Sequence, residues 1–232
     1  MTEFDKYALE YDRMHAENVK PSGYDPAFFD EYKVREIHRV LAAEGRADEP
    51  LSILNFGCGI GKSEPFLEQY FPNAAILGCD VSVESLKLAR RNNEGLRRTR
   101  FEFFEEGRPL PFAAVFDVIF IANVFHHIPH NRHEEILRDL RGHLAPRGTA
   151  FMFEHNPLNP LTVRTINRCP FDVDAVLLKP SYSVSLYHAA GFSRVDRRFT
   201  LFFPHFLGAL RPFEPRLAWL PLGAQYYIRA QG

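Results

Sequence analysis

The stretch LSILNFGCGIGKSEP, residues 51–65, constrains the fold of this 232-residue chain more than any other. Its apolar start, residues 51–56, is typical of a buried parallel strand. Gly57, Gly59 and Gly61 follow at alternate positions. Glycine lets the backbone turn tightly and approach a ligand closely, because it carries no side chain. The stretch therefore predicts a strand that runs into a ligand-binding turn.

The spacing of the glycines separates this turn from two other glycine-rich loops. A P-loop needs a glycine five positions before the glycine of GKS, and Phe56 stands there. A dinucleotide fingerprint needs a glycine at its sixth position, where this chain has Lys62. After the turn, Ser63 is expected to cap a helix whose first turn tolerates Pro65. The amino terminus of that helix would face the ligand.

A second unit of the same kind follows. Residues 74–80 are expected to form a strand that ends in Asp80, and residues 81–92 a helix that Ser82 caps. Because Asp80 lies 19 residues after Gly61, the ends of two strands are expected to meet at one crevice. A carboxylate there can accept hydrogen bonds from two ribose hydroxyls. The alternative is that Asp80 only caps the helix after it.

The rest of the chain continues the alternation. Strands are expected at residues 100–104, 115–122, 149–156, 192–203 and 224–230. Within residues 131–148 we expect an amphipathic helix that ends before Pro146 and Gly148. Strands that alternate with helices at this interval predict a parallel sheet with helices on both faces.

Composition narrows the class of protein. The net charge of -1 gives no indication of a nucleic-acid partner. The polar start and the lack of an apolar run of about 18 residues indicate a cytoplasmic protein without a transmembrane segment, and leave peripheral membrane contact open. Cys58, Cys79 and Cys169 are too few and too scattered for a disulfide framework or a zinc site.

Four motifs in this order resemble one family. ILNFGCGIG, GCD, LPF…FDVIFIANVFHHI and LRGHLAPRGTAFMFE make the chain similar to the class I S-adenosylmethionine-dependent methyltransferases over about residues 35–200. The resemblance implies an α/β fold with a Rossmann-like seven-stranded sheet, mostly parallel with one antiparallel strand, and helices on both faces. It also implies S-adenosylmethionine as the cofactor.

The resemblance also implies a set of cofactor-binding residues. The glycine loop would surround the methionine part, Asp80 would bind the ribose hydroxyls, and Asn123 would face the cofactor amine. The loop with Glu105 and Glu106 would meet the adenine edge. Asn55 departs from the family, which usually has Asp or Glu there. Tyr11 either contacts the cofactor or belongs to an ordinary apolar helix face. The full set is Tyr11, Asn55, Gly57, Cys58, Gly59, Gly61, Asp80, Val81, Glu105, Glu106 and Asn123.

Methyl transfer from a sulfonium is an in-line displacement, which needs no metal and needs a base only if the nucleophile must lose a proton. His126, His127, Glu154 and His155 are candidates for that base, because they follow strands whose ends are expected to face the crevice. The alternative for the two adjacent histidines is a polar start to a helix. A metal site is not expected: Pro129 breaks the helical spacing of the histidine run, and no carboxylate or cysteine completes a ligand set.

We expect one methyltransferase domain over residues 1–232, with an N-terminal helical cap over about 1–45. Two insertions, about 155–180 and 202–222, carry several prolines and many apolar residues. We expect them to form a lid that closes an apolar pocket and shields Trp219, or else a flap over the sheet edge.

Three functions are compatible with these features. The first is methyl transfer to an O or N nucleophile of a small-molecule acceptor, which could be apolar or lipid-linked. The second is a cofactor-binding scaffold or regulator that does not methylate. The third, a nicotinamide oxidoreductase, is disfavoured by the position of the third glycine.

Overall fold

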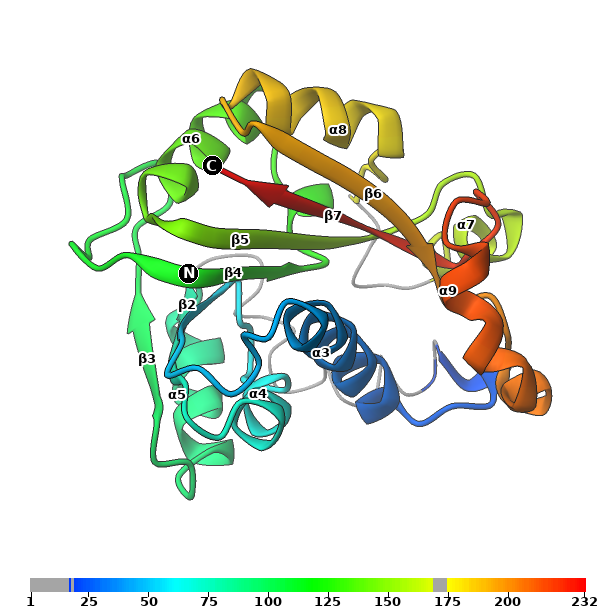
Figure 1. Ribbon diagram of the computed structural model, residues 1–232, viewed down its shortest axis with the longest axis horizontal. Coiled ribbons are helices and arrows are strands. Elements are labelled where there is room, and N and C mark those ends of the chain that lie inside the picture. The colour runs from blue at the N-terminus through cyan, green and yellow to red at the C-terminus, as the bar shows by residue number, and fades with distance from the viewer. Residues whose placement is uncertain (1–16, 18, 169–174) are drawn as a thin grey trace.

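The computed structural model describes residues 17, 19–168 and 175–232, which form a seven-stranded sheet flanked by helices (Figure 1). The strand order is β3-β2-β1-β4-β5-β7-β6. β7 runs antiparallel to β5 and β6, and the remaining pairs are parallel. The predicted fold class is therefore confirmed. The strands are β1 (Ser52–Phe56), β2 (Ala75–Asp80), β3 (Thr99–Phe103), β4 (Phe116–Ala122), β5 (Leu144–His155), β6 (Arg194–Thr200) and β7 (Gln225–Gln231).

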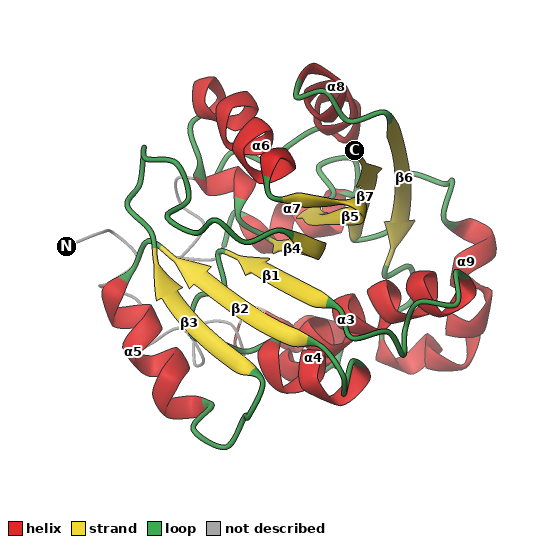
Figure 2. Cartoon of the chain, turned by 60° about the vertical axis from the view of Figure 1, so that its left-hand side comes forward, coloured by secondary structure: helices red, strands yellow, loops and turns green. Residues whose placement is uncertain are grey.

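Helices cover both faces of the sheet (Figures 1 and 2). α3 (Pro26–Ala43) and α4 (Glu64–Tyr70) pack on one face, where Ile37 and Leu41 are fully buried. α6 (His133–Gly142) and α8 (Pro180–Ala189) pack on the other, around Leu137 and Tyr187. α5 (Val83–Asn92) contacts β2 and β3. Two buried layers hold the sheet, so the carboxyl ends of its central strands form a fixed edge.

Local sequence explains where the helices around this edge begin. Asp25 accepts a hydrogen bond from the backbone of Ala27, and Pro26 takes the first position of α3. Ser82 caps α5 as predicted, because its hydroxyl accepts a bond from the Ser85 amide at 3.0 Å. Ser63 precedes α4 as predicted, but its side chain makes no capping hydrogen bond.

The helix predicted to end before Pro146 is shorter in the structure. A 3₁₀ turn, η3 (His130–Arg132), leads into α6, which ends at Gly142. Leu144 then pairs with Phe116 of β4. The residues before and after Pro146 therefore extend the fifth strand and do not prolong the helix.

Two long connections leave the sheet at the carboxyl end of β5 and β6. Gln225 at the start of β7 pairs with both His155 and Thr200, so the two connections start side by side. The first contains α7 (Pro160–Ile166), and the second contains η5 (His205–Phe213) and α9 (Glu214–Leu217). Two further 3₁₀ turns are η1 (Lys20–Ser22) and η2 (Phe125–His127).

The expectation that Trp219 is shielded is wrong. Its side chain is 71% exposed. The carbonyl of the preceding Ala218 accepts a hydrogen bond from the Phe199 amide of β6 at 2.8 Å, and Ala218 is buried. The backbone is thus fixed against the edge strand with Trp219 on the outside.

Candidate active site

The glycine loop lies between β1 and α4 and is tied to the next strand. The amides of Gly57 and Cys58 both donate to the Cys79 carbonyl, at 2.8 and 3.0 Å. Gly57, Gly59 and Gly61 all have positive φ, which favours glycine. The loop therefore takes the tight turn that the sequence predicts.

The three glycines are needed for different reasons. A Cβ on Gly57 would lie 2.5 Å from Val124, and one on Gly61 would collide with Asn93 and Ala89. A Cβ on Gly59 would meet no described atom within 4 Å. Gly57 and Gly61 thus allow the loop to pack, whereas Gly59 borders the open cavity.

That cavity has a volume of about 330 Å³ and lies at the carboxyl edge of the sheet. This volume is within the range of small-molecule sites. The structure brings most of the predicted cofactor-binding residues to its wall. These are Asn55, Gly57, Cys58, Gly59, Asp80, Val81, Glu106 and Asn123.

Asp80 connects the cavity to the glycine loop. Its side chain is 9% exposed, and one carboxylate oxygen accepts from the Gly59 amide at 2.8 Å. The other oxygen accepts from the Ser82 amide, also at 2.8 Å. A carboxylate has about four acceptor positions and can accept from several donors at once. Asp80 can therefore hold the loop and accept bonds from ligand hydroxyls.

Asn123 follows β4 with φ of 56°, a left-handed conformation that non-glycine residues adopt infrequently. The backbone N–H of Asn123 donates to the Phe153 carbonyl at 2.9 Å. Among the described residues, no donor reaches its buried Oδ1 atom. A buried acceptor of this kind is costly unless a ligand supplies a donor. Asn123 therefore offers an acceptor to a charged or neutral N–H group in the cavity.

Lys33 is a cavity residue that the sequence prediction missed. It lies on α3, is 3% exposed, and donates from Nζ to the Phe29 carbonyl at 3.0 Å. Burial lowers its pKa, while the nearby carboxylates of Asp30 and Glu154 act in the opposite direction. The signal that could have revealed it is its spacing: Lys33, Ile37 and Leu41 recur every four residues along one buried side of the helix. Lys33 gives this end of the cavity an amine that can donate hydrogen bonds, and burial disfavours its charged form.

The remaining predicted cofactor residues differ in placement. Glu106 lines the cavity, whereas Glu105 lies on the outer side of the loop beside Arg108 at 3.9 Å. Gly61 lies behind the loop against α5. Burial raises the pKa of the Cys58 thiol well above its usual range, so this thiol stays protonated. Tyr11 lies outside the described residues.

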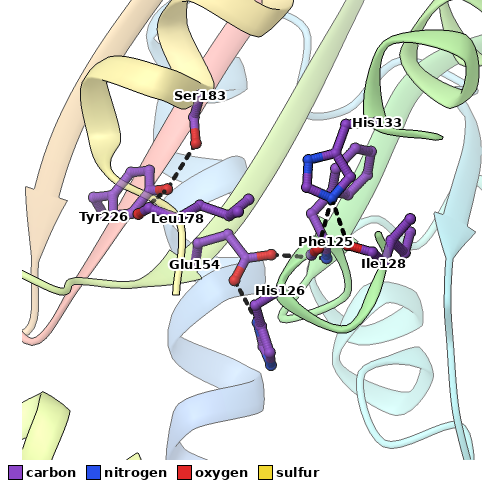
Figure 3. Close-up of polar contacts among 8 residues, drawn as sticks. All are labelled: Phe125, His126, Ile128, His133, Glu154, Leu178, Ser183 and Tyr226. Carbon is purple, nitrogen blue, oxygen red and sulfur yellow. Dashed lines mark hydrogen bonds and ion pairs between the residues drawn. The ribbon is translucent and has the colours of Figure 1, made fainter. Parts of the chain in front are cut away.

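Of the four candidate bases, His127 lines the cavity and the other three do not. His126 and Glu154 form a buried pair, with Nδ1 of His126 2.6 Å from a Glu154 oxygen (Figure 3). The other oxygen of Glu154 accepts from the Phe125 amide at 2.9 Å. The expectation that His126 and Glu154 face the crevice is therefore wrong, because Glu154 points into the protein to hold η2.

The buried pair positions the residue that does face the cavity. The His126 and His127 rings have centroids 4.2 Å apart. Glu154 holds both Phe125 and His126, and it thereby fixes the turn that carries His127 from the side buried in the protein. His127 is thus the one candidate base that combines cavity exposure with a rigid backbone.

His133 completes the support of this turn (Figure 3). Its Nε2 atom lies 3.0 Å from the Phe125 carbonyl and 2.8 Å from the Ile128 carbonyl. Both partners are acceptors, so Nε2 carries a proton and is unsuited to bind a metal. Burial also lowers the pKa of this histidine. Among the described residues, no cluster of three or more histidines, cysteines or carboxylates is arranged to bind a metal ion.

Asn55 stands behind the glycine loop. Its Nδ2 atom donates to Oε1 of Glu64 at 2.8 Å. Glu64 is fully buried at the start of α4, and burial raises its pKa to about 7. Asn55 thus lines the cavity and also contacts the first residue of α4.

Sequence comparisons place these residues in a known context. A family model described as a methyltransferase domain matches residues 54–150. Trans-aconitate 2-methyltransferase of Rhodopseudomonas palustris (strain BisA53) is 32% identical over 111 residues, or 47% of this chain and 41% of that protein. Malonyl-[acyl-carrier protein] O-methyltransferase of Halalkalibacterium halodurans is 30% identical over 113 residues, again 47% and 41%. The chain spans about two fifths of the length of these curated relatives.

The fold of this chain is similar to that of a solved methyltransferase. The crystal structure of magnesium protoporphyrin IX methyltransferase from Synechocystis PCC 6803 with bound S-adenosylhomocysteine has a TM-score of 0.61 to this chain at 13% identity. The match covers 93% of this chain and 86% of that one. At this identity the likeness concerns the fold alone. The family match covers residues 54–150, the segment that holds the glycine loop and Asp80, and it supports the predicted resemblance to the class I S-adenosylmethionine-dependent methyltransferases and their cofactor.

Proposed function

We propose that this protein transfers a methyl group from S-adenosylmethionine to an O or N nucleophile of a small-molecule acceptor. The observation that carries the proposal is that the wall suited to the cofactor and His127 line the same cavity. A protein that only bound the cofactor would not need a rigidly held histidine in the same cavity.

The wall suits both ends of the cofactor. Asp80 would accept bonds from the ribose hydroxyls, and Glu106 would lie toward the adenine. At the other end, the buried Oδ1 of Asn123 would accept from the ammonium group of the methionine part. Lys33 would pair with the carboxylate of that part, which would offset the cost of burying its charge. Gly59 would let the backbone approach the cofactor between these ends.

When bound, the cofactor supplies an electrophilic methyl group attached to a sulfonium. The residues of the chain orient the acceptor and exclude water, and together these can contribute most of the rate of an in-line displacement. A ring nitrogen of His127 would take the proton of a hydroxyl or amine acceptor. For a carboxylate acceptor there is no proton to remove, and His127 would only position it.

The relatives suggest which acceptors to test first. Their names state that they methylate trans-aconitate and malonyl-[acyl-carrier protein]. Both are carboxylate compounds, so we propose a carboxylate as the first acceptor class. We also propose that residues 1–232 act as one domain, in which the cap over about 1–45 contributes Lys33 and the insertions over about 155–180 and 202–222 influence the choice of acceptor.

Calorimetry and turnover together test the proposal. Titration with S-adenosylmethionine, S-adenosylhomocysteine and NAD should show binding of the first two and none of NAD. Turnover is then followed as release of S-adenosylhomocysteine with trans-aconitate, malonyl-[acyl-carrier protein] and a panel of hydroxyl and amine acceptors. Cofactor binding without turnover on any acceptor would favour the scaffold or regulatory role.

The role of His127 is tested with the active acceptor. For a hydroxyl or amine, His127→Gln should lower kcat at least about tenfold and leave the affinity for S-adenosylhomocysteine unchanged. His130→Gln is the matched control, because His130 is exposed and lies outside the cavity wall. Equal activity of the two variants would remove His127 from the reaction.

A further inference from the structure

The two connections at the carboxyl edge of the sheet expose an unusual number of large apolar side chains. Phe206 is 82% exposed and Trp219 is 71% exposed. Monomeric soluble proteins seldom leave such side chains clustered in water unless the surface binds something. We call the following residues the edge surface: Leu158, Leu161, Phe206, Phe213, Trp219 and Leu222.

Hydrogen bonds join the two connections into one surface. The Asn156 side chain donates to the carbonyls of Pro221 and Gly223, at 3.1 and 2.8 Å. The Asn159 side chain, beside Leu158, donates to the Leu222 carbonyl at 2.7 Å. The start of α7 therefore lies against the turn that follows Trp219, and Figure 1 shows α7 and α9 at the same end of the molecule.

Two charged side chains of the second connection, Glu214 and Arg211, point inward, which reverses the usual arrangement. Glu214 is buried and accepts from the Tyr32 hydroxyl at 2.8 Å and from the amides of Phe202 and Phe203. The guanidinium of Arg211 lies over the Phe28 ring at 4.1 Å. These contacts fasten the connection to α3 while Phe206 and Phe213 stay outside. The exposed apolar groups are thus held by a built scaffold.

In the described part of the two connections, the exposed charges are of one sign. Over residues 156–168 and 201–224, both fully described, the only acidic residue is the buried Glu214. Arg164, Arg168 and Arg216 are all exposed. Basic residues around exposed Trp, Phe and Leu side chains are typical of proteins that lie on anionic lipid headgroups. A second copy of the chain would bring the same positive charges against these arginines and would be repelled.

We propose that the edge surface docks this protein peripherally on an anionic phospholipid membrane. Phe206, Phe213 and Trp219 would enter the headgroup region, and the arginines would pair with lipid phosphates. None of the described helices has the length and apolar character needed to cross a bilayer, so the contact would stay at the surface. The connections and the cavity both lie at the carboxyl edge of the sheet, and docking would therefore bring the cavity close to the lipid.

Vesicle binding tests this proposal independently of methyl transfer. The protein is mixed with vesicles of phosphatidylcholine alone or with 30% phosphatidylglycerol, and binding is measured by sedimentation and by Trp219 fluorescence, since Trp219 is the only tryptophan. We expect binding to the anionic vesicles with a blue shift of the emission, weaker binding to neutral vesicles, and release at high salt. Failure to bind the anionic vesicles, with Trp219 emission unchanged, would overturn the proposal.

Variants separate the two contributions. Arg164→Gln with Arg168→Gln should weaken binding to anionic vesicles about fivefold for each arginine. Phe206→Ser should weaken binding about tenfold and leave the affinity for S-adenosylhomocysteine unchanged. Val115→Ser is the matched control, because Val115 is 56% exposed and precedes β4 at the opposite edge of the sheet. Equal losses with Val115→Ser and Phe206→Ser, or a dimer in light scattering that Phe206→Ser dissociates while vesicle binding persists, would contradict lipid docking.

Discussion

Removing the Asp80 carboxylate should weaken both the fold and cofactor binding. In Asp80→Ala, the amides of Gly59 and Ser82 each lose an acceptor at 2.8 Å. Hydrogen bonds to a charged group contribute about 1.5–3 kcal/mol each, so the two together would give about 3–6 kcal/mol. Because the Gly59 amide borders a cavity that water can enter, we expect a smaller loss in the free energy of unfolding, about 2–4 kcal/mol. The loss of the ribose contacts should weaken the binding of S-adenosylhomocysteine by about 1–3 kcal/mol.

Denaturant unfolding and calorimetry with S-adenosylhomocysteine measure the two losses separately. Ser82→Ala is the control, because the Ser82 hydroxyl caps α5 through the Ser85 amide and does not line the cavity. It should cost about 1 kcal/mol of stability and leave the affinity unchanged. Asp80→Asn keeps one acceptor oxygen and should lie between wild type and Asp80→Ala in both measurements.

Two results would refute this reasoning. A folded Asp80→Ala variant that binds S-adenosylhomocysteine as tightly as wild type would remove Asp80 from the cofactor site. A loss of affinity in Ser82→Ala as large as in Asp80→Ala would mean that Asp80 acts only through the start of α5, as the helix-capping alternative holds.

Three further predictions concern the loop and the chemistry. Gly59→Val should abolish measurable binding of S-adenosylhomocysteine in calorimetry, because its side chain would enter the cavity, whereas Gly57→Ala should mainly lower the melting temperature by its clash with Val124. Once an acceptor is known, turnover should survive EDTA, because the displacement needs no Lewis acid; loss of activity with rescue by zinc would contradict this. The pKa of Glu64 is about 7 in the fold and about 4.5 as its ordinary value, so the folded carboxyl keeps a proton that the unfolded chain releases. The free energy of unfolding of wild type minus that of Glu64→Gln should therefore fall by about 3 kcal/mol as pH rises from about 4.5 to 7, and stay constant above pH 7. A difference that does not change with pH in denaturant unfolding would contradict the buried carboxyl.

The parts of the site that lie at strand ends could be predicted from the sequence. Apolar runs place β1 and β2, and parallel strands bring their carboxyl ends to one edge, so Gly59 and Asp80 had to meet. The pattern could not tell the three glycines apart. Gly57 and Gly61 must lack a side chain because Val124 and Asn93 pack against them. These two residues are distant in the chain and contact the loop only in the folded protein.

The residues that the sequence analysis misplaced share a different cause. The HHI motif does not show which of its two adjacent histidines faces the cavity. The orientation depends on Glu154, which lies 28 residues from His126 in the chain and holds its ring inside the protein through a hydrogen bond. Lys33 was hidden because a lysine on a helix normally lies in solvent. Trp219 was expected inside because apolar residues usually are, but Glu214 and Arg211 take the inner positions.

The departure of Asn55 from the family has a physical reason that only the structure supplies. The family's usual Asp or Glu at this place would put a second carboxyl group about 3 Å from Glu64, where Asn55 now donates at 2.8 Å. Two buried carboxylates at that distance cannot both ionise without a large cost. An amide avoids the repulsion and gives Glu64 a donor, while Glu64 in the first turn of α4 is favoured by the helix dipole. Asn55 and Glu64 thus act as a hydrogen-bonded pair, so a change at either position alters the surroundings of the other.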